Sequence, residues 1–269
     1  IQHIIEEALS SEINNMLLIT GRGKNSIEDH FDHNPWLESF LKEKNKSELI
    51  ETTERIARCA NFAYIRQTEP LGLGHAIWLA RHYIGKEHFA IALPDDIIMS
   101  KQPALAQLIR IARQEKASVI ALQEVPANQV SSYGIVSIKK QITPNLFQLS
   151  GMIEKPSQKN APSNLAIVGR YILSSKIFQS LEEISSYAQG EMQLTDAINH
   201  MAQNGERVFG YKLQGTRFDI GIPSGWVKAV ISYALQDPEY AENIRTFINE
   251  IGQTQGFKIE MPSKNIETF

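Results

Sequence analysis

The sequence has very little cysteine, since Cys59 is the only one in 269 residues. A single thiol excludes an internal disulfide framework and a metal site built from several thiolates, and it fits a reduced, cytoplasmic setting. No apolar run approaches the roughly 20 residues that cross a membrane, and no signal-peptide pattern is present. The net charge of −3 gives no electrostatic reason to expect nucleic acid or an anionic membrane as a partner.

The known catalytic patterns of hydrolases are also missing. No Ser/His/Asp or Cys/His set carries a local nucleophile signature, and no His or Cys spacing matches a zinc site. Asp29, His30, Asp32 and His33 lie close in sequence, but nothing else supports a metal there, so we interpret them as surface charge and helix caps. We interpret Cys59 as structural or incidental.

The apolar residues that are present, 42% of the chain, alternate between strand-like runs and helical stripes up to about residue 125. This alternation predicts a mainly parallel, doubly wound α/β sheet. After Val125-Pro126 the pattern changes to paired strands, which predicts a smaller β-rich part, followed by C-terminal helices. The runs that predict strands are 16–20, 62–65, 89–93, 117–122, 133–138, 146–149, 152–156, 164–173, 208–213 and 217–221.

A glycine-rich turn, residues 66–76, links two of these strands. Pro70 prevents a helix from crossing the junction, and Gly72 and Gly74 precede a segment with helical spacing. In open parallel sheets, ligands bind at the carboxyl ends of strands, and glycine lets backbone approach a base or phosphate closely. Loop punctuation remains the alternative explanation, because two glycines at this spacing are a weak signal.

Polar groups follow three other strands: the acidic pair Asp95 and Asp96, Glu154 with Lys155, and Asp219. Separated carboxylates with a lysine fit metal-assisted chemistry on a phosphorylated ligand. Each group also has a plain alternative. The acidic pair could cap the next helix, Glu154 and Lys155 could form a surface ion pair, and Asp219 could end a strand before a turn.

A set of ordered segments goes further than these patterns. The sequence resembles the bacterial UTP–glucose-1-phosphate uridylyltransferases, of the sugar nucleotidyltransferase superfamily, from Ile1 to about Glu250. The segments that carry the resemblance are 18–24 (LITGRGK), 27–32 (IEDHFD), 66–76 (RQTEPLGLGHA), 93–96 (LPDD), 132–136 (SYGIV), 154–156 (EKP), 162–171 (PSNLAIVGRY), 191–198 (EMQLTDAI) and 217–221 (RFDIG).

The resemblance implies a Rossmann-like mixed sheet and a transferase that joins UTP and glucose 1-phosphate into UDP-glucose and pyrophosphate, without a covalent intermediate. Asp95 and Asp219 would hold Mg²⁺, and Lys155 would pair with the sugar phosphate. Gln67 would read the uracil edge and Gly72 would lie against the base. The residues that would contact the glucose are Gly134, Glu154, Val168, Gly169 and, in a supporting role, Glu191.

The same resemblance divides the chain. We expect one domain over 1–250, with a nucleotide-binding half (1–125), a sugar-binding half (126–222), C-terminal helices (223–250) that form a dimer or tetramer contact, and a loose tail (251–269). The family places a strand and a glycine-rich triphosphate loop before the helix that opens this chain. We therefore expect residues 1–269 alone to be inactive or very weak. The alternatives are a thymidylyl- or cytidylyltransferase, and a non-catalytic nucleotide-sugar-binding subunit.

Overall fold

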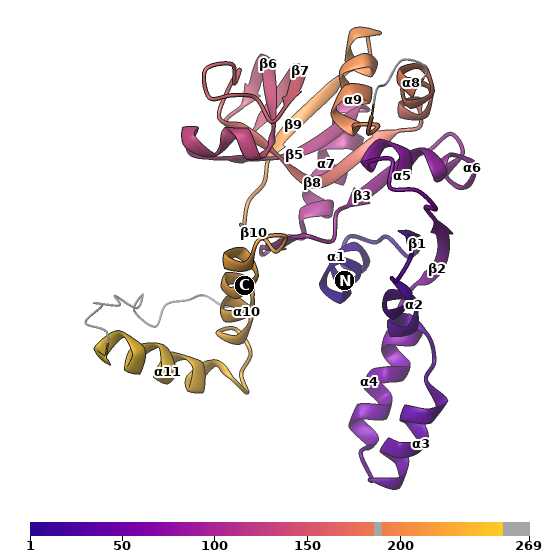
Figure 1. Cartoon of the computed structure of the whole chain (residues 1–269), viewed down its shortest axis with the longest axis vertical. Coiled ribbons are helices and arrows are strands. Elements are labelled where there is room, and N and C mark those ends of the chain that lie inside the picture. The colour runs from indigo at the N-terminus through magenta and orange to yellow at the C-terminus, as the bar shows by residue number, and fades with distance from the viewer. Residues whose placement is uncertain (186–189, 255–269) are drawn as a thin grey trace.

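A six-stranded mixed sheet forms the centre of the molecule (Figure 1). The computed structural model describes residues 1–185 and 190–254. Only β5 and β9 run parallel within this sheet, and its other neighbouring strands are antiparallel. In spatial order its strands are β3 (His88–Ala92), β8 (Leu165–Ser174), β5 (Ser118–Glu124), β9 (Val208–Lys212), β7 (Leu146–Glu154) and β6 (Gly134–Thr143).

Helices cover both faces of this sheet, so its central strands are buried on both sides. In β5, Ile120 and Leu122 pack on one face, while Val119 and Ala121 pack on the other. This alternation is the two-residue period of a strand, and it explains why β5 and β8 read as continuous apolar runs. The first face is covered by α5 (Leu73–Leu79), α8 (Lys176–Ser185) and α9 (Leu194–Gln203), and the second by α1 (Gln2–Leu9) and α7 (Ala104–Glu115).

Two small sheets lie outside the central one. β1 (Asn15–Thr20) and β2 (Asn61–Arg66) pair in parallel, and β4 (Asp96–Met99) pairs antiparallel with β10 (Thr216–Asp219). The second pair places Asp219 directly opposite Asp96. This pairing joins two segments more than a hundred residues apart and places Asp96 beside Gly169 of β8.

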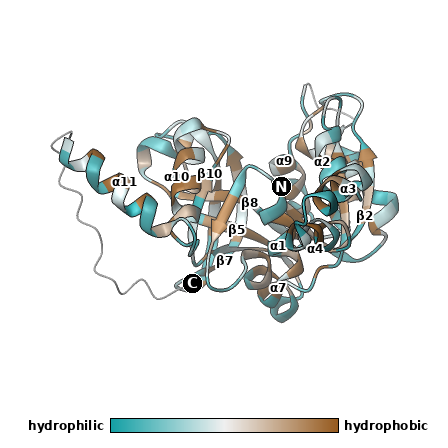
Figure 2. Ribbon diagram, turned by 90° about the horizontal axis from the view of Figure 1, so that it is seen from below, coloured by the Kyte–Doolittle hydropathy of each residue, from teal (hydrophilic) through white to brown (hydrophobic). Residues whose placement is uncertain are grey.

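The remaining elements lie around this body. α2 (Asn25–Phe31) leads to a projecting pair, α3 (Pro35–Glu43) and α4 (Ser47–Ala57). α6 (Arg81–Ile84) follows α5, and a 3₁₀ turn covers Ala127–Ser132. α10 (Pro223–Ala234) and α11 (Ala241–Thr254) extend away from the sheets (Figure 1) and carry exposed apolar side chains. Figure 2 shows polar and apolar residues mixed along α11. None of the helices in the described part of the chain has the length and apolar character to cross a membrane.

Three expectations about the elements need correction. The central sheet is mixed, as the family resemblance implied, and not mainly parallel as the alternation of elements predicted, because β8 lies between β3 and β5 and runs antiparallel to both. The acidic pair caps no helix, since Asp96 begins strand β4. The expected tail starts too early, because α11 continues to Thr254; residues 255–269 of that tail lie outside the described residues.

Candidate active site

A cavity of about 300 Å³ opens where β4 and β10 meet β8 and the end of β7. Its volume is at the lower end of the range for small-molecule sites. Six of the residues to which the resemblance assigned a role line it together: Asp95, Gly134, Glu154, Lys155, Gly169 and Asp219. The other lining residues are Leu73, Leu93, Asp96, Ser132, Tyr133, Ile167, Tyr171, Gln193, Leu194, Thr195 and Arg217.

The two carboxylates of the acidic pair have different environments. Asp95 is exposed at the cavity, whereas Asp96 is buried and accepts a 2.6 Å hydrogen bond from the Gly169 amide. Asp96 also forms an ion pair with the half-buried Arg217. Burial raises the pKa of Asp96 above its usual value, although Arg217 and the Gly169 amide oppose that shift. Asp96 is therefore a structural anchor, and Asp95 is the one free to meet a ligand.

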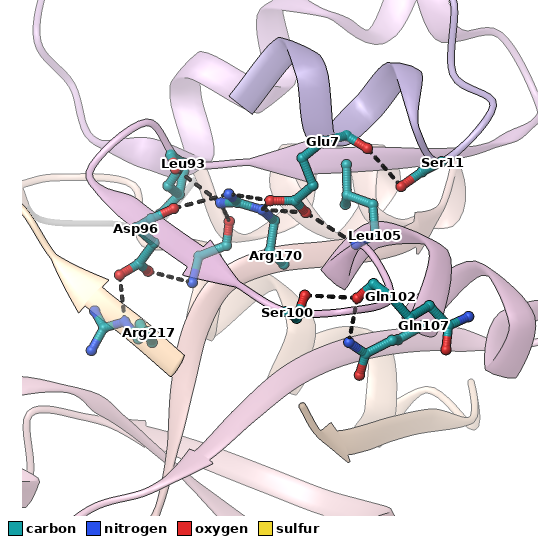
Figure 3. Close-up of polar contacts among 11 residues, drawn as sticks. Glu7, Ser11, Leu93, Asp96, Ser100, Gln102, Leu105, Gln107, Arg170 and Arg217 are labelled. Atoms are coloured by element: carbon teal, nitrogen blue, oxygen red, sulfur yellow. Dashed lines mark hydrogen bonds and ion pairs between the residues drawn. The ribbon is translucent and has the colours of Figure 1, made fainter. Parts of the chain in front are cut away.

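A buried arginine holds the turn that carries this pair (Figure 3). Arg170 has no exposed surface, and its guanidinium donates to the carbonyls of Leu93 (3.0 Å) and Asp96 (2.9 Å). Its charge is balanced by Glu7 of α1, with nitrogen–oxygen distances of 2.9, 3.0 and 3.2 Å. The planar guanidinium suits this arrangement, because one edge of the group bonds the carboxylate while its other N–H donors reach backbone carbonyls.

Asp95 and Asp219 converge on the turn after β10. A methyl group placed on Gly221 would lie 3.1 Å from Asp219 Oδ1 and 3.8 Å from Asp95 Oδ2, so both carboxylates face the same point. The Ile220 amide donates to the Asp95 carbonyl at 2.8 Å, and Asp219 Oδ1 accepts from the Gly221 amide at 3.1 Å. Asp219 therefore does end its strand in a turn, as the plain alternative proposed, and it lines the cavity as well.

These two carboxylates fit a hard divalent cation only in part. Within residues 1–185 and 190–254, no group of three or more His, Cys, Asp or Glu side chains is arranged to hold a metal ion. Mg²⁺ usually takes one or two protein carboxylates and completes its shell with water and substrate phosphates. A two-carboxylate site therefore fits a Mg²⁺ that binds together with a phosphorylated substrate.

Glu154 and Lys155 lie at the end of β7, and both are exposed to the cavity. Glu154 pairs with Gly134 across β6 and β7, and the Lys155 amide donates to the Tyr133 carbonyl at 3.0 Å. Lys155 adopts a left-handed backbone with φ of 45°, which an L-residue rarely takes. No ion pair joins Glu154 and Lys155 among the described residues, so the surface-pair alternative for them is not what the structure contains.

The remaining predicted residues lie outside this cavity lining. Gln67 bonds through Nε2 to the Gly72 carbonyl (3.2 Å) and to His75 Nδ1 (2.9 Å). Val168 is buried on the α7 face of β8, because its neighbours Ile167 and Gly169 take the cavity face. Glu191 is exposed and bonds Gln193 at 3.3 Å.

The glycines of the turn have a structural explanation. The Gly74 amide donates to the Met192 carbonyl, and the Met192 amide donates to the Leu71 carbonyl, both at 2.8 Å. A Cβ on Gly72 would lie 2.8 Å from the Met192 carbonyl oxygen, and Gly72 has φ of 96°. Glycine is therefore required there by the close approach of the segment before α9.

Several residues around the site lie in segments that carry the family resemblance, but the sequence gave none of them a role of its own. Arg170 lies in an apolar strand, and Arg217 precedes an apolar residue, so neither stands out by spacing. The Arg217 guanidinium lies over the ring of Tyr133, with 5.0 Å between Arg217 Cζ and the ring centroid. Thr195 lies in the first turn of α9, which reads as an ordinary amphipathic helix. The β4–β10 pairing brings Arg217 to the cavity, and the packing of α9 on the sheet brings Thr195 there.

Comparison with known proteins gives consistent matches. The family model described as "Nucleotidyl transferase" matches residues 1–235. The protein named UTP–glucose-1-phosphate uridylyltransferase of Bacillus subtilis (strain 168) is 42% identical over 248 residues, covering 92% of this chain and 84% of that one. The structure named UTP-bound UGPase from Acinetobacter baumannii superimposes with a TM-score of 0.85 at 35% identity, covering 93% of this chain and 87% of the other. A UDP-glucose pyrophosphorylase structure in complex with UDP-glucose gives a TM-score of 0.78 at 34% identity, covering 88% and 86%.

Proposed function

The chain belongs to the nucleotidyl transferase family, among the UTP–glucose-1-phosphate uridylyltransferases, and from this premise we propose how its residues carry out the transfer. The activity is the transfer of a uridylyl group from UTP to glucose 1-phosphate, which gives UDP-glucose and pyrophosphate. The observation that supports our assignment of roles most strongly is that Asp95, Asp219, Glu154 and Lys155 line one cavity although they come from three different segments.

We assign the metal to Asp95 and Asp219. Enzymes of this family use a divalent metal, and we propose Mg²⁺, because the two carboxylates leave room for phosphate oxygens in its shell. When bound, the cation neutralises phosphate charge as the α-phosphorus of UTP is attacked. Asp96 takes no part in this site, because it is buried and bonded to Gly169 and Arg217, whereas the side chain of Asp219 stays partly exposed beside its weaker contact with Arg217.

Lys155 orients the nucleophile. Its ammonium group pairs with the phosphate of glucose 1-phosphate and offsets the repulsion between two anions that must approach in line. Reaction proceeds by direct attack of that phosphate oxygen on the α-phosphorus, with pyrophosphate leaving. Glu154 and the backbone of Gly134, Val168 and Gly169 hold the glucose. We propose only a supporting role for Glu191, which lies outside the cavity lining.

Gln67 and Gly72 form the nucleoside end of the site. The Gln67 side-chain nitrogen is bonded within the turn, and its oxygen accepts no hydrogen bond from the described residues. That oxygen can accept from the N3–H of uracil, which distinguishes uracil from cytosine. On this basis we propose that 1–125 binds the nucleotide and 126–222 binds the sugar.

Removal of either metal-binding carboxylate tests these roles. In the protein expressed from its full reading frame, Asp95→Ala and Asp219→Ala should each lower Mg²⁺-dependent UDP-glucose formation about 100-fold or more, since a metal contributes several kcal/mol to such a transition state. Asp29→Ala removes an exposed carboxylate that does not line the cavity and serves as the matched control. Wild-type turnover in both variants, with circular dichroism unchanged, would falsify the assignment.

Self-association is a separate proposal. α10 carries Trp226, Val227, Val230 and Ile231 in exposed positions, and α11 adds Phe247. We propose that these helices form the contact of a homodimer or homotetramer. Sedimentation velocity should show an assembly for the native protein and a monomer for the double variant Trp226→Ser/Val230→Ser, while Trp36→Ser, on the exposed α3, should leave the assembly intact.

A further inference from the structure

His75 is bonded to the side chain that we assign to the nucleobase. The side-chain nitrogen of Gln67 lies 2.9 Å from His75 Nδ1 and 3.2 Å from the Gly72 carbonyl oxygen. An amide nitrogen donates hydrogen bonds and accepts none, so Nδ1 is the ring nitrogen that carries no proton in this contact. The N–H donors of the Gln67 amide are therefore both used within the protein.

These two acceptors determine which end of the Gln67 amide stays free. If the amide were turned over, its oxygen would face the Gly72 carbonyl and the lone pair of His75 Nδ1, and no hydrogen would lie between the facing acceptors. In the present orientation the oxygen is the free end, and it accepts no hydrogen bond from the described residues. A free acceptor selects a base whose edge presents a donor.

Both partners of this contact are themselves held in place. His75 is half-buried in the first turn of α5, and its ring stacks on that of Trp78, with 6.1 Å between the ring centroids. The Gln67 backbone is tied to the end of β1, because its amide donates to the Thr20 carbonyl at 2.8 Å. The imidazole can therefore act as a fixed reference for the orientation of the Gln67 amide.

We propose that His75 is a positioning residue that sets the choice of pyrimidine by holding the Gln67 oxygen toward the base. The inference rests on the proposed role of Gln67 and gives His75 a function that this role does not include. Uracil presents an N–H donor at N3, whereas cytosine presents an acceptor there and needs the amide nitrogen instead. His75 therefore acts on selectivity between bases and not on the transfer step.

The test compares kcat/KM for UTP and CTP, with glucose 1-phosphate, in the protein expressed from its full reading frame. His75→Leu removes the acceptor and should lower the UTP-to-CTP ratio of kcat/KM about two- to ten-fold, which is the effect of one hydrogen bond. His75→Asn places an amide oxygen near the position of Nδ1 and should keep the native ratio. His82→Leu removes an exposed imidazole on α6 and is the matched control.

This ratio separates positioning from a purely structural role. It does not depend on the amount of folded protein, so a loss of stability alone lowers both values of kcat/KM by the same factor. Since His75 acts through Gln67, His75→Leu should have no further effect on the ratio in a Gln67→Leu background. His75→Ala also lacks the acceptor, and the same results are expected from it if His75→Leu does not fold.

Three results would overturn the inference about His75. They are a native ratio in His75→Leu, a loss in His75→Asn as large as that in His75→Leu, and an undiminished effect of His75→Leu in the Gln67→Leu background. A native ratio in Gln67→Leu itself would refute the proposed role of Gln67, and the inference would fall with it. Absence of UTP turnover by the native protein would refute the proposed function as a whole.

Discussion

The ion pair between Glu7 and Arg170 should be one of the most sensitive points of the fold. Glu7→Ala would leave the fully buried Arg170 with backbone carbonyls as its remaining described partners. It would also remove the acceptor of the Leu105 amide, which donates to Glu7 Oε1 at 3.1 Å. Breaking a buried pair in this way costs about 3–5 kcal/mol, because one charge stays behind in a medium that solvates it poorly.

The size of this effect can be read in unfolding experiments. For a domain of this size, about 3–5 kcal/mol corresponds to a fall in melting temperature of about 6–20 °C. Urea unfolding followed by circular dichroism gives the free energy directly, provided that the transition is two-state. Glu7→Gln retains an acceptor oxygen and should lose less, about 1.5–3 kcal/mol.

A matched control comes from an ion pair at the surface. Lys176 bonds Glu206, but the Lys176 side chain is 63% exposed, so Lys176→Ala should change the free energy of unfolding by only about 0–1 kcal/mol. The reasoning fails if Glu7→Ala changes the free energy of unfolding no more than Lys176→Ala does. That result would mean that Arg170 is held well enough by the carbonyls of the acidic turn, or that water reaches it.

Three further predictions concern other positions. Gly169→Ala places a methyl 2.7 Å from both Asp96 Oδ2 and Leu93 Cβ. We therefore expect the free energy of unfolding, measured in urea, to fall by about 1–3 kcal/mol. An unchanged urea midpoint would show that the turn can shift at no cost. Burial raises the pKa of Tyr171 above its usual value of about 10. Above that pH only the unfolded chain ionises at this position, so the stabilisation that is present below about pH 10 is lost as the pH rises. Tyr171→Phe should therefore lose less stability than the native protein between about pH 9.5 and 11, and an equal loss of unfolding free energy per pH unit would contradict this. Burial also raises the pKa of the Cys59 thiol, so a thiol reagent at pH 7.5 should react with it more slowly than with the urea-unfolded chain, and equal rates would count against the shift.

The strands and helices could be predicted because their signals are local. The run 165–173 is apolar at nearly every position because β8 is covered on both faces, and the stripe of α7 has helical spacing because only one side packs on the sheet. Polar residues at strand ends marked Asp95, Glu154, Lys155 and Asp219, since a strand that leaves the core must end where side chains meet solvent.

The tertiary structure decided how these pieces combine. Periodicity does not state which strands become neighbours, so the antiparallel β8 between β3 and β5 could not be read from the alternation of elements. Asp95 and Asp96 are chemically identical in the sequence, and only the positions of Gly169 and Arg217 make one of them an anchor. Arg170 owes its role to contacts made across long stretches of chain, with Glu7 and with the carbonyls of Leu93 and Asp96, because burial is a property of packing and not of spacing.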